Sequence, residues 1–359
     1  MAHSQDPTDR GSRRHRPPPR ADRDAVADLR RIAFLLERAQ ETTYRVRAFR
    51  RAAATLTGLE RSELAERIDA GTLTELPDVG EVTARCVAES LAGEEPVYLR
   101  RLAATAGTPV AEGGAAVRAA LRGDLHMHSD WSDGGSPIGE MATTARDLGH
   151  EYAALTDHSP RLTVAHGLTA ERLREQLTVV AQAQEELAPF RLLTGIEVDI
   201  NADGTLDQDD DLLAGLDIVV ASIHSGLRMA AADMTKRMVS AIANPRVDIL
   251  GHCTGRMVTG NRRRPESSFD AEIVFAACQS FDVAVEVNSR PERLDPPKRL
   301  LRLAVEAGCR VSIDTDAHAP GQLDWQPYGA ERAAACGVDP DTIVNTWPVD
   351  RLLEWSRRR

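Results

Sequence analysis

The stretch GDLHMHSDWSDG, residues 123–134, decides the fold of this chain. It opens with a run that predicts a short β-strand, and two histidines and an aspartate stand at or just beyond the end of that run. The arrangement recurs in LTDHS, LTGIEVDI, ASIHS, ILGHCTGR and IDTDAH, where a His, Asp or Glu follows a short apolar run rich in β-branched residues. The candidate metal ligands are His126, His128, Asp133, His158, Glu197, His224, His252, Asp316 and His318.

These side chains should meet, because the carboxyl ends of parallel strands lie on one face of a (β/α) barrel, where active sites are built. Neutral imidazoles and carboxylates suit zinc, manganese or iron, and nine ligands are too many for one ion. We therefore expect two or three divalent metal ions and hydrolysis of a phosphate ester. A single histidine such as His224 is more often structural, and Asp133 alone could belong to a turn in SDGGS. Their joint occurrence at successive strand ends favours the metal centre.

Composition bounds the rest of the chain. The 359 residues accommodate the barrel and one small domain, and 42% hydrophobic residues are enough for a full core. Apolar runs stay well short of the ~18 residues that cross a bilayer, so no membrane partner is expected. The five cysteines are odd in number and form no C-x-x-C motif, which indicates reduced thiols and a cytoplasmic location. The net charge of −11 falls on the barrel region, which is therefore no nucleic-acid platform by itself.

The part of the chain before the barrel has a different character. It begins with a polar segment that contains PPP and is expected to be disordered. Helical spacing of apolar residues follows, then the basic amphipathic stretch TYRVRAFRRAAATL, then LPDVG, which predicts a tight turn that opens a helix. The small-residue stretch ATAGTPVAEGGAA predicts a linker. The predicted division is a disordered tail at residues 1–21, a helical domain at 22–98, a linker at 99–120 and the barrel at 121–359.

From GDLHMHSDWSDG to IDTDAH, the ordered ligand set resembles the PHP family, named for polymerase and histidinol phosphatase. The resemblance implies a distorted seven-stranded (β/α) barrel that holds a trinuclear centre. It places His126, His128, Glu197 and Asp316 at one end of the cluster, with Glu197 as a bridge and the other five ligands completing the remaining ions. GIEVDI, GTLD, GHCTGR and EVNSRPERLD are most similar to the PHP domain of bacterial family X DNA polymerases.

Residues 24–95 resemble the N-terminal helical domain of family X DNA polymerases, which ends in a helix-hairpin-helix motif. The resemblance rests on YRVRAFRRAA and on the LPDVG turn. Physically, such a turn offers backbone N–H groups to a DNA phosphate, and arginines add attraction that does not depend on sequence. A helical module with a solvated arginine face is the alternative. The expected DNA contacts are Arg45, Arg47, Arg50, Arg51 and Gly80.

Two departures from that family limit the expected activity. Asp78 occupies a glycine position of the hairpin and places an anion beside the phosphate site. Cys86 occupies the place of the lysine that forms a Schiff base in the lyases of the family, and the two lysines of the chain, Lys236 and Lys298, lie in the barrel. We therefore expect no Schiff-base lyase activity in the helical domain. The short linker leaves no room for a polymerase core, so no DNA synthesis is expected either.

The resulting hypothesis is a metal-dependent phosphoesterase, a DNA 3′-end exonuclease or abasic-site endonuclease of DNA repair, with DNA as its partner. One alternative is a phosphatase of small phosphomonoesters, similar to the histidinol phosphatases. A second is a DNA-binding adaptor with an inert barrel, against which the intact ligand set argues. Guanidinium groups match phosphate geometry and an amide can orient a substrate oxygen. The candidate substrate-binding residues are Arg161, Arg256, Asn288 and Arg293.

Overall fold

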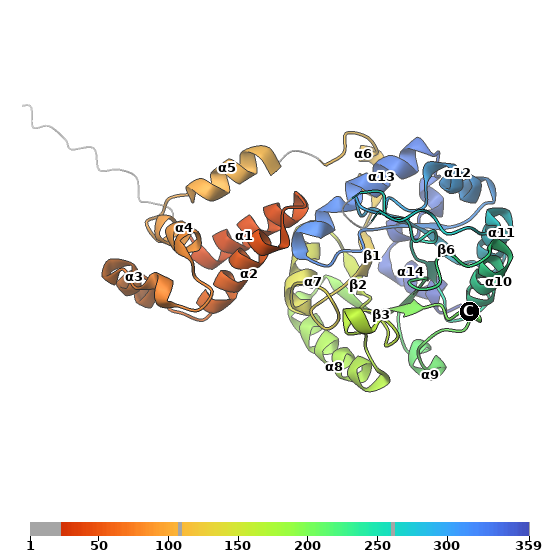
Figure 1. Cartoon of the computed structure of the whole chain (residues 1–359), viewed down its shortest axis with the longest axis horizontal. Helices are drawn as coiled ribbons and strands as arrows, with labels where there is room; N and C mark the ends of the chain where they lie inside the picture. The colour runs from red at the N-terminus through yellow and green to blue at the C-terminus, as the bar shows by residue number, and fades with distance from the viewer. Residues whose placement is uncertain (1–22, 107–109, 260–262, 359) are drawn as a thin grey trace, which may run out of the picture. The chain divides into compact units, whose positions relative to one another are not determined.

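The computed structural model describes residues 23–106, 110–259 and 263–358 (Figure 1). The tail predicted at residues 1–21 lies outside them. The chain separates into two compact units. One contains the described residues up to Ile32 together with Arg47–Ala103, and the other contains Ala33–Val46 and the chain from Ala104 onward.

The first unit is helical, as its sequence predicts. Leu29 and Ile32, three residues apart, are completely buried, and Leu56 and Val87 of later helices join them in the core. Such spacing places apolar side chains on one face of each helix. The elements from Ala25 to Ala106 are α1 (Ala25–Arg38), α2 (Thr43–Leu56), α3 (Arg61–Ala70), the 3₁₀ turn η1 (Leu73–Glu75), α4 (Glu81–Leu91) and α5 (Val97–Ala106).

The segment predicted as a linker, residues 99–120, contains helical structure. Most of α5 lies within it, and so does the short helix α6 (Ala115–Ala120). Three of the ten residues of α5 and four of the six residues of α6 are alanine, which has the highest intrinsic helix propensity. The segment predicted as a linker therefore includes most of α5, which ends at Ala106, and all of α6, which begins at Ala115.

The second unit is a barrel of seven strands that lie in chain order, each parallel to the next. A parallel bridge between Met127 and Ala317 brings the first strand beside the chain that follows the last. This confirms the predicted distorted (β/α)₇ barrel, which follows a small all-α domain in the sequence. The strands are β1 (Gly123–Met127), β2 (Tyr152–Leu155), β3 (Arg191–Asp199), β4 (Ile218–Ser222), β5 (Ile249–Leu250), β6 (Ala284–Asn288) and β7 (Val311–Asp314).

Helices surround the strands of this unit (Figure 1). The strands are buried on both faces, as parallel strands between a barrel interior and a helical layer must be. The α-helices are α7 (Ile138–Asp147), α8 (Ala170–Leu187), α9 (Asp210–Leu213), α10 (Ala231–Ile242), α11 (Ala271–Ser280), α12 (Lys298–Glu306), α13 (Gln326–Ala335) and α14 (Val349–Ser356). The 3₁₀ segments are η2 (Thr163–Ala165), η3 (Pro320–Trp325), η4 (Pro340–Thr342) and η5 (Val344–Thr346).

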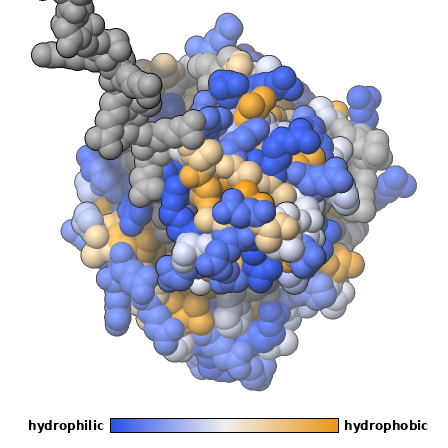
Figure 2. Space-filling model, turned by 90° about the vertical axis from the view of Figure 1, so that its left-hand side faces the viewer, coloured by the Kyte–Doolittle hydropathy of each residue, from blue (hydrophilic) through white to orange (hydrophobic). Residues whose placement is uncertain are grey.

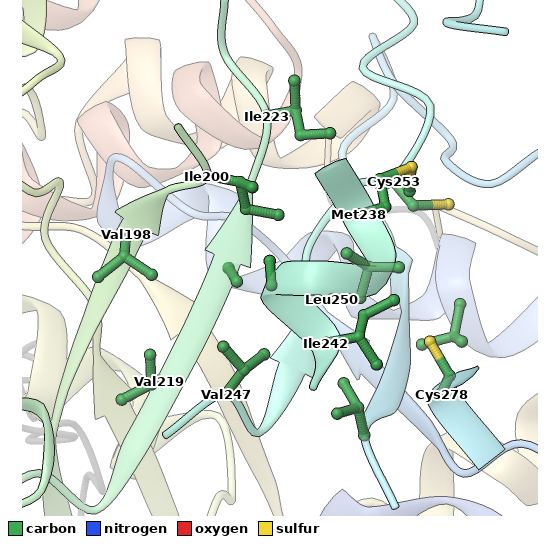
Figure 3. Close-up of a cluster of buried hydrophobic side chains, with 14 of the residues drawn as sticks. Val198, Ile200, Val219, Ile223, Met238, Ile242, Val247, Leu250, Cys253 and Cys278 are labelled. Atoms are coloured by element: carbon green, nitrogen blue, oxygen red, sulfur yellow. The ribbon is translucent and has the colours of Figure 1, made fainter. Parts of the chain in front are cut away.

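The largest apolar cluster of the barrel fixes α10 against the strands. Met238 and Ile242 of this helix gather with Val219 of β4 and Leu250 of β5 (Figure 3). All four side chains are at most 1% exposed. Burial of such a side chain contributes about 1.5–3 kcal/mol, so this packing holds the helix, and the loops at its ends, in one position.

Hydrophilic residues dominate the face shown in Figure 2, and hydrophobic ones occur there in small areas. Among the described residues, no helix combines the length and the apolar character that crossing a bilayer requires.

Candidate metal centre

The nine predicted ligands meet at the carboxyl ends of the strands. His126 lies within β1 and Glu197 within β3, whereas the others follow β1, β2, β4, β5 and β7 in the connecting loops. Ligand atoms from these residues form three groups, each compact enough to hold a metal ion. The groups are His128, Asp133, His158 and His318; then His126, His128 and Glu197; then His158, Glu197 and His224.

Glu197 is the centre of the cluster. Its Oε1 lies 2.8 Å from His252 Nε2 and 3.4 Å from His224 Nε2. Its Oε2 lies 2.8 Å from His158 Nδ1 and 3.4 Å from His126 Nε2. One carboxylate thus faces histidines from four different strand ends, which is the arrangement that a bridging ligand requires.

Asp316 brings a second carboxylate to the deep end of the cluster. Its Oδ1 lies 3.5 Å from His128 Nε2 and 3.9 Å from His126 Nε2. The backbone of Asp316 has a φ of +53°, a left-handed conformation that a non-glycine residue adopts at a cost of about 1–3 kcal/mol. The fold maintains this conformation where it directs the carboxylate into the cluster.

Asp133 and His318 form the outer end of the cluster. Asp133 Oδ1 lies 3.3 Å from His318 Nε2 and 3.5 Å from His158 Nε2. The SDGGS turn positions Asp133, because a Cβ on Gly134 would come within 2.5 Å of the Ser129 carbonyl oxygen. The Asp133 side chain is 36% exposed, whereas those of His126 and Glu197 are completely buried. Solvent therefore reaches the cluster from the Asp133 end.

Unpaired polar atoms indicate that this donor set fits metal ions. Among the described residues, Nε2 of His126, His128 and His224 and Oε2 of Glu197 are buried and have no hydrogen-bond partner. Each such atom costs about 1–3 kcal/mol when it is left unsatisfied. A divalent cation bound by these lone pairs would remove that cost, and imidazole and carboxylate are suitable donors for zinc, manganese or iron.

The charges within the cluster keep its carboxylates ionised. Burial raises the pKa of Glu197, but the charges of His224, His126 and His158 outweigh burial and hold that pKa well below its usual value. For His128, burial and then the neighbouring histidines lower the pKa well below its usual value, so its ring stays neutral. The anionic carboxylates and the neutral ring of His128 are in the protonation states that metal binding needs. For His224, burial lowers the pKa, but the charge of Glu197 outweighs burial and raises that pKa to about 9, so a metal ion would have to displace a proton there.

Two carboxylates that the sequence analysis did not identify orient the ligand rings. Glu286 Oε1 lies 2.6 Å from His126 Nδ1, and Asp199 Oδ1 lies 2.5 Å from His224 Nδ1. Each partner fixes Nδ1 and leaves Nε2 directed toward Glu197, as carboxylates behind metal-bound histidines do. A signal was present in the sequence, because Asp199 follows Glu197 by two residues, and alternate residues of a strand share a face.

Two of the four predicted substrate-binding residues hold Asp316. Asn288 Nδ2 donates to Asp316 Oδ2 at 3.1 Å, and Arg293 Nε lies 3.0 Å from the same oxygen. Both contacts are made to Oδ2, whereas Oδ1 faces the histidines and lies 3.8 Å from Arg290 Nη1. Arg290, which the sequence analysis did not single out, donates to the Asp316 backbone carbonyl oxygen. Arg293 Nη1 is buried without a hydrogen-bond partner among the described residues.

The other two predicted substrate-binding residues are occupied elsewhere. Arg256 donates through Nε to the Arg293 carbonyl oxygen at 3.0 Å and through Nη2 to that of Leu294. It therefore ties the loop after β5 to the loop after β6. Arg161 is exposed and donates through Nη1 to Asn201 Oδ1 at 2.7 Å.

Several of the predicted DNA contacts in the helical part have intramolecular partners. Arg51 pairs with Asp78 at 3.6 Å, and the Gly80 N–H donates to Thr83 Oγ1 at 3.0 Å. Arg45 pairs with Glu41 at 2.6 Å, Arg47 is exposed and Arg50 is half-buried. The residue in the hairpin's glycine position, Asp78, has a φ of +59°, so it adopts the left-handed conformation that glycine favours.

Cys86 is buried within this helical unit. Its side chain is 2% exposed, and burial raises the pKa of the thiol to about 11. It therefore offers neither an amine nor an accessible thiolate.

Comparison with known proteins agrees with this architecture. The PHP domain family matches residues 124–289, and a helix-hairpin-helix domain family matches residues 21–95. Over 225 residues the chain is 42% identical to the DNA polymerase/3′-5′ exonuclease PolX of Bacillus subtilis. The match covers 63% of this chain and 39% of the length of that relative. The chain is also 30% identical to a probable phosphatase of Caldanaerobacter subterraneus subsp. tengcongensis. This match covers 66% of this chain and 91% of the length of that relative.

A solved structure of lower similarity is the histidinol phosphate phosphatase from Lactococcus lactis in complex with zinc, L-histidinol and phosphate. It is 18% identical, covers 60% of this chain and 92% of its own, and has a TM-score of 0.44.

The barrel and its ligand cluster define a metal-dependent hydrolase of phosphate ester bonds. The chain belongs to the PHP domain family, and a helix-hairpin-helix domain precedes the PHP barrel in the sequence.

Proposed function

We propose that this enzyme hydrolyses phosphodiester bonds in DNA, at 3′ ends or at abasic sites, and that it has neither polymerase nor lyase activity. The observation that carries the proposal is one chain that joins a helix-hairpin-helix domain to a barrel with nine candidate ligands at its strand ends, among which Glu197 faces four histidines. The similarity to a protein named as a polymerase and 3′-5′ exonuclease supports it.

We further propose that the cluster holds three divalent ions. The deep ligands would be His126, His128, Glu197 and Asp316, and the outer ones Asp133, His158 and His318. His224 and His252, which both face Glu197 Oε1, would complete the third group. Zinc, manganese and iron all suit these donors. Bound ions would supply Lewis-acid charge and a water of lowered pKa.

The residues of the chain then have distinct tasks. Glu197 directs one oxygen to each side of the cluster, and Glu286 and Asp199 keep two histidine rings in the ligating orientation. A phosphate would enter from the exposed Asp133 end. Arg293 Nη1, a buried donor without a partner among the described residues, is suited to bind a phosphate oxygen as negative charge develops there.

A phosphatase of small phosphomonoesters is the second candidate. It is favoured by the similarity to a probable phosphatase that the chain covers almost completely, at 91% of its length. Such an enzyme would use the same cluster and would have no need of the helical domain. A third possibility, a DNA-binding adaptor with an inert barrel, conflicts with a complete ligand set.

One experiment distinguishes these functions. Purified protein with Mn²⁺ or Zn²⁺ is offered 3′-labelled DNA, abasic DNA and histidinol phosphate side by side, with His128→Ala as the inactive control. We expect cleavage of one or both DNA substrates at a rate well above that for histidinol phosphate. Preferential release of phosphate from histidinol phosphate would support the phosphatase, and no hydrolysis of any substrate would support the adaptor.

A further inference from the structure

Arg237 is a buried arginine on α10 that lies outside the ligand set. Its residue is 2% exposed, which is unusual for a cation. Met234, Met238 and Ile242 of the same helix pack into the apolar cluster between α10 and the strands, and Figure 3 shows Met238 and Ile242 there. The helix is thereby fixed, and Arg237 extends from it toward the loops at the strand ends.

The guanidinium group of Arg237 binds backbone carbonyl oxygens from two neighbouring loops. Nε donates to the Asn201 oxygen at 2.9 Å and to the Ile200 oxygen at 3.2 Å, and Nη2 also donates to Ile200. Nη1 donates to the Ser225 oxygen at 2.8 Å. Ile200 and Asn201 follow the end of β3, and Ser225 belongs to the loop after β4. A single planar cation therefore joins the two loops.

These carbonyls belong to residues adjacent to the metal centre. Ile200 directly follows Asp199, and Ser225 directly follows His224. Asp199 Oδ1 and His224 Nδ1 lie 2.5 Å apart, and this contact orients the ring so that Nε2 lies 3.4 Å from Glu197 Oε1. The distance between the two loops thus decides whether His224 reaches the cluster.

A role in binding substrate is excluded by the same contacts. The side chain is buried, and all three of its nitrogens already donate to the protein. Burial lowers the pKa of Arg237, and the charge of Asp199 opposes that effect. A lysine could not reproduce the fork, because its single nitrogen cannot reach carbonyls on both sides with the same geometry.

We propose that Arg237 is a positioning residue for the metal centre, and that it acts through His224 by joining the loops after β3 and β4. This inference rests on the metal centre proposed above but not on DNA as the substrate. Mutation of a residue that hydrogen-bonds to a metal ligand typically lowers metal affinity by about 10–100-fold. Arg237 is one contact further from the metal than such a residue. We therefore expect its mutation to lower the metal affinity of one site by about 10-fold, near the lower limit of that range.

The test is a metal titration of the whole protein. Wild type, Arg237→Met and Arg237→Lys are stripped with chelator, checked for folding by circular dichroism, and titrated with Zn²⁺ by calorimetry. Arg246→Met serves as the matched control, because Arg246 makes a partly exposed ion pair with Asp210, 3.0 Å away. We expect one site to weaken about 10-fold in Arg237→Met and less in Arg237→Lys, while Arg246→Met matches wild type.

A double-mutant cycle with His224→Ala separates positioning from general support of the fold. If Arg237 acts through His224, adding Arg237→Met to His224→Ala causes no further loss of zinc affinity. Equal weakening of every site, additive losses, or a folded Arg237→Met that titrates as wild type would overturn the inference. If Arg237→Met does not fold, the zinc titration of Arg237→Lys is the test. Zinc affinities of Arg237→Lys equal to those of wild type would then overturn the inference. Absence of zinc binding by wild type would instead refute the proposed metal centre.

Discussion

The buried histidine His150 should make the barrel less stable at low pH, by an amount that follows from its pKa. The side chain is 4% exposed, and neither ring nitrogen has a hydrogen-bond partner among the described residues. Burial, and then the charge of Arg118, lower the pKa of His150 to about 3. The unfolded chain has the ordinary histidine pKa of about 6.5. Between these two values the unfolded state binds a proton that the folded state does not, so stability falls as pH falls.

The magnitude follows from the two pKa values. Between pH 8 and pH 5 the unfolded state gains about 2 kcal/mol from protonation of this one histidine, while the folded state gains almost nothing. His150→Leu removes the titrating group and leaves a side chain of similar size. The free energy of unfolding of wild type should therefore drop by about 2 kcal/mol more than that of the variant over this range.

The assay is urea unfolding of both proteins at pH 8 and pH 5, in chelator so that metal binding does not contribute. The difference between the proteins isolates His150, because every other titrating group is common to both. Equal losses of stability in wild type and His150→Leu would refute the reasoning, and so would a His150 pKa near 6.5 measured by NMR.

Three further predictions concern the two parts of the chain. Glu286→Gln removes the carboxylate behind His126 and should weaken metal binding about 10–100-fold in a zinc titration; unchanged affinity would show that the 2.6 Å contact has no orienting role. Changing Arg47 and Arg50 to alanine should weaken DNA binding and reduce its salt slope by up to about two units, while hydrolysis of a small chromogenic phosphate stays the same; equal loss on both substrates would indicate structural support instead. With Cys86 buried in place of a lysine, borohydride should trap no adduct with abasic DNA, and any cleavage should stop with EDTA; a trapped complex that survives chelation would contradict this.

The sequence predicted the ligand cluster because strand ends have a fixed place in a parallel barrel. His126 and Asp316 are far apart in the chain, yet both stand where a strand ends, and the fold then brings them together. Likewise, helical spacing predicted where Leu29 and Ile32 pack. Periodicity and position thus determined which residues approach one another.

What the sequence did not predict is how the arginines and the outer carboxylates are used. Arg256 was predicted to bind phosphate and Arg237 was not singled out, but both donate to backbone carbonyls of adjacent loops. Glu286 was not identified because its role depends on the Nδ1 atom of His126, which belongs to a different strand far away in the sequence. Such choices depend on loop conformations, and loops have no periodicity from which their contacts could be read.

The central claim, a hydrolytic metal cluster around Glu197, is tested most directly by measuring metal content and activity together. Wild type, His128→Ala and Asp316→Asn are purified and analysed for bound metal by mass spectrometry, and the hydrolysis of a chromogenic phosphodiester is measured on the same samples. We expect two or three divalent ions per wild-type chain. Each folded variant should bind fewer ions and lose hydrolysis. Wild-type turnover in either variant, or in metal-free wild type, would contradict it.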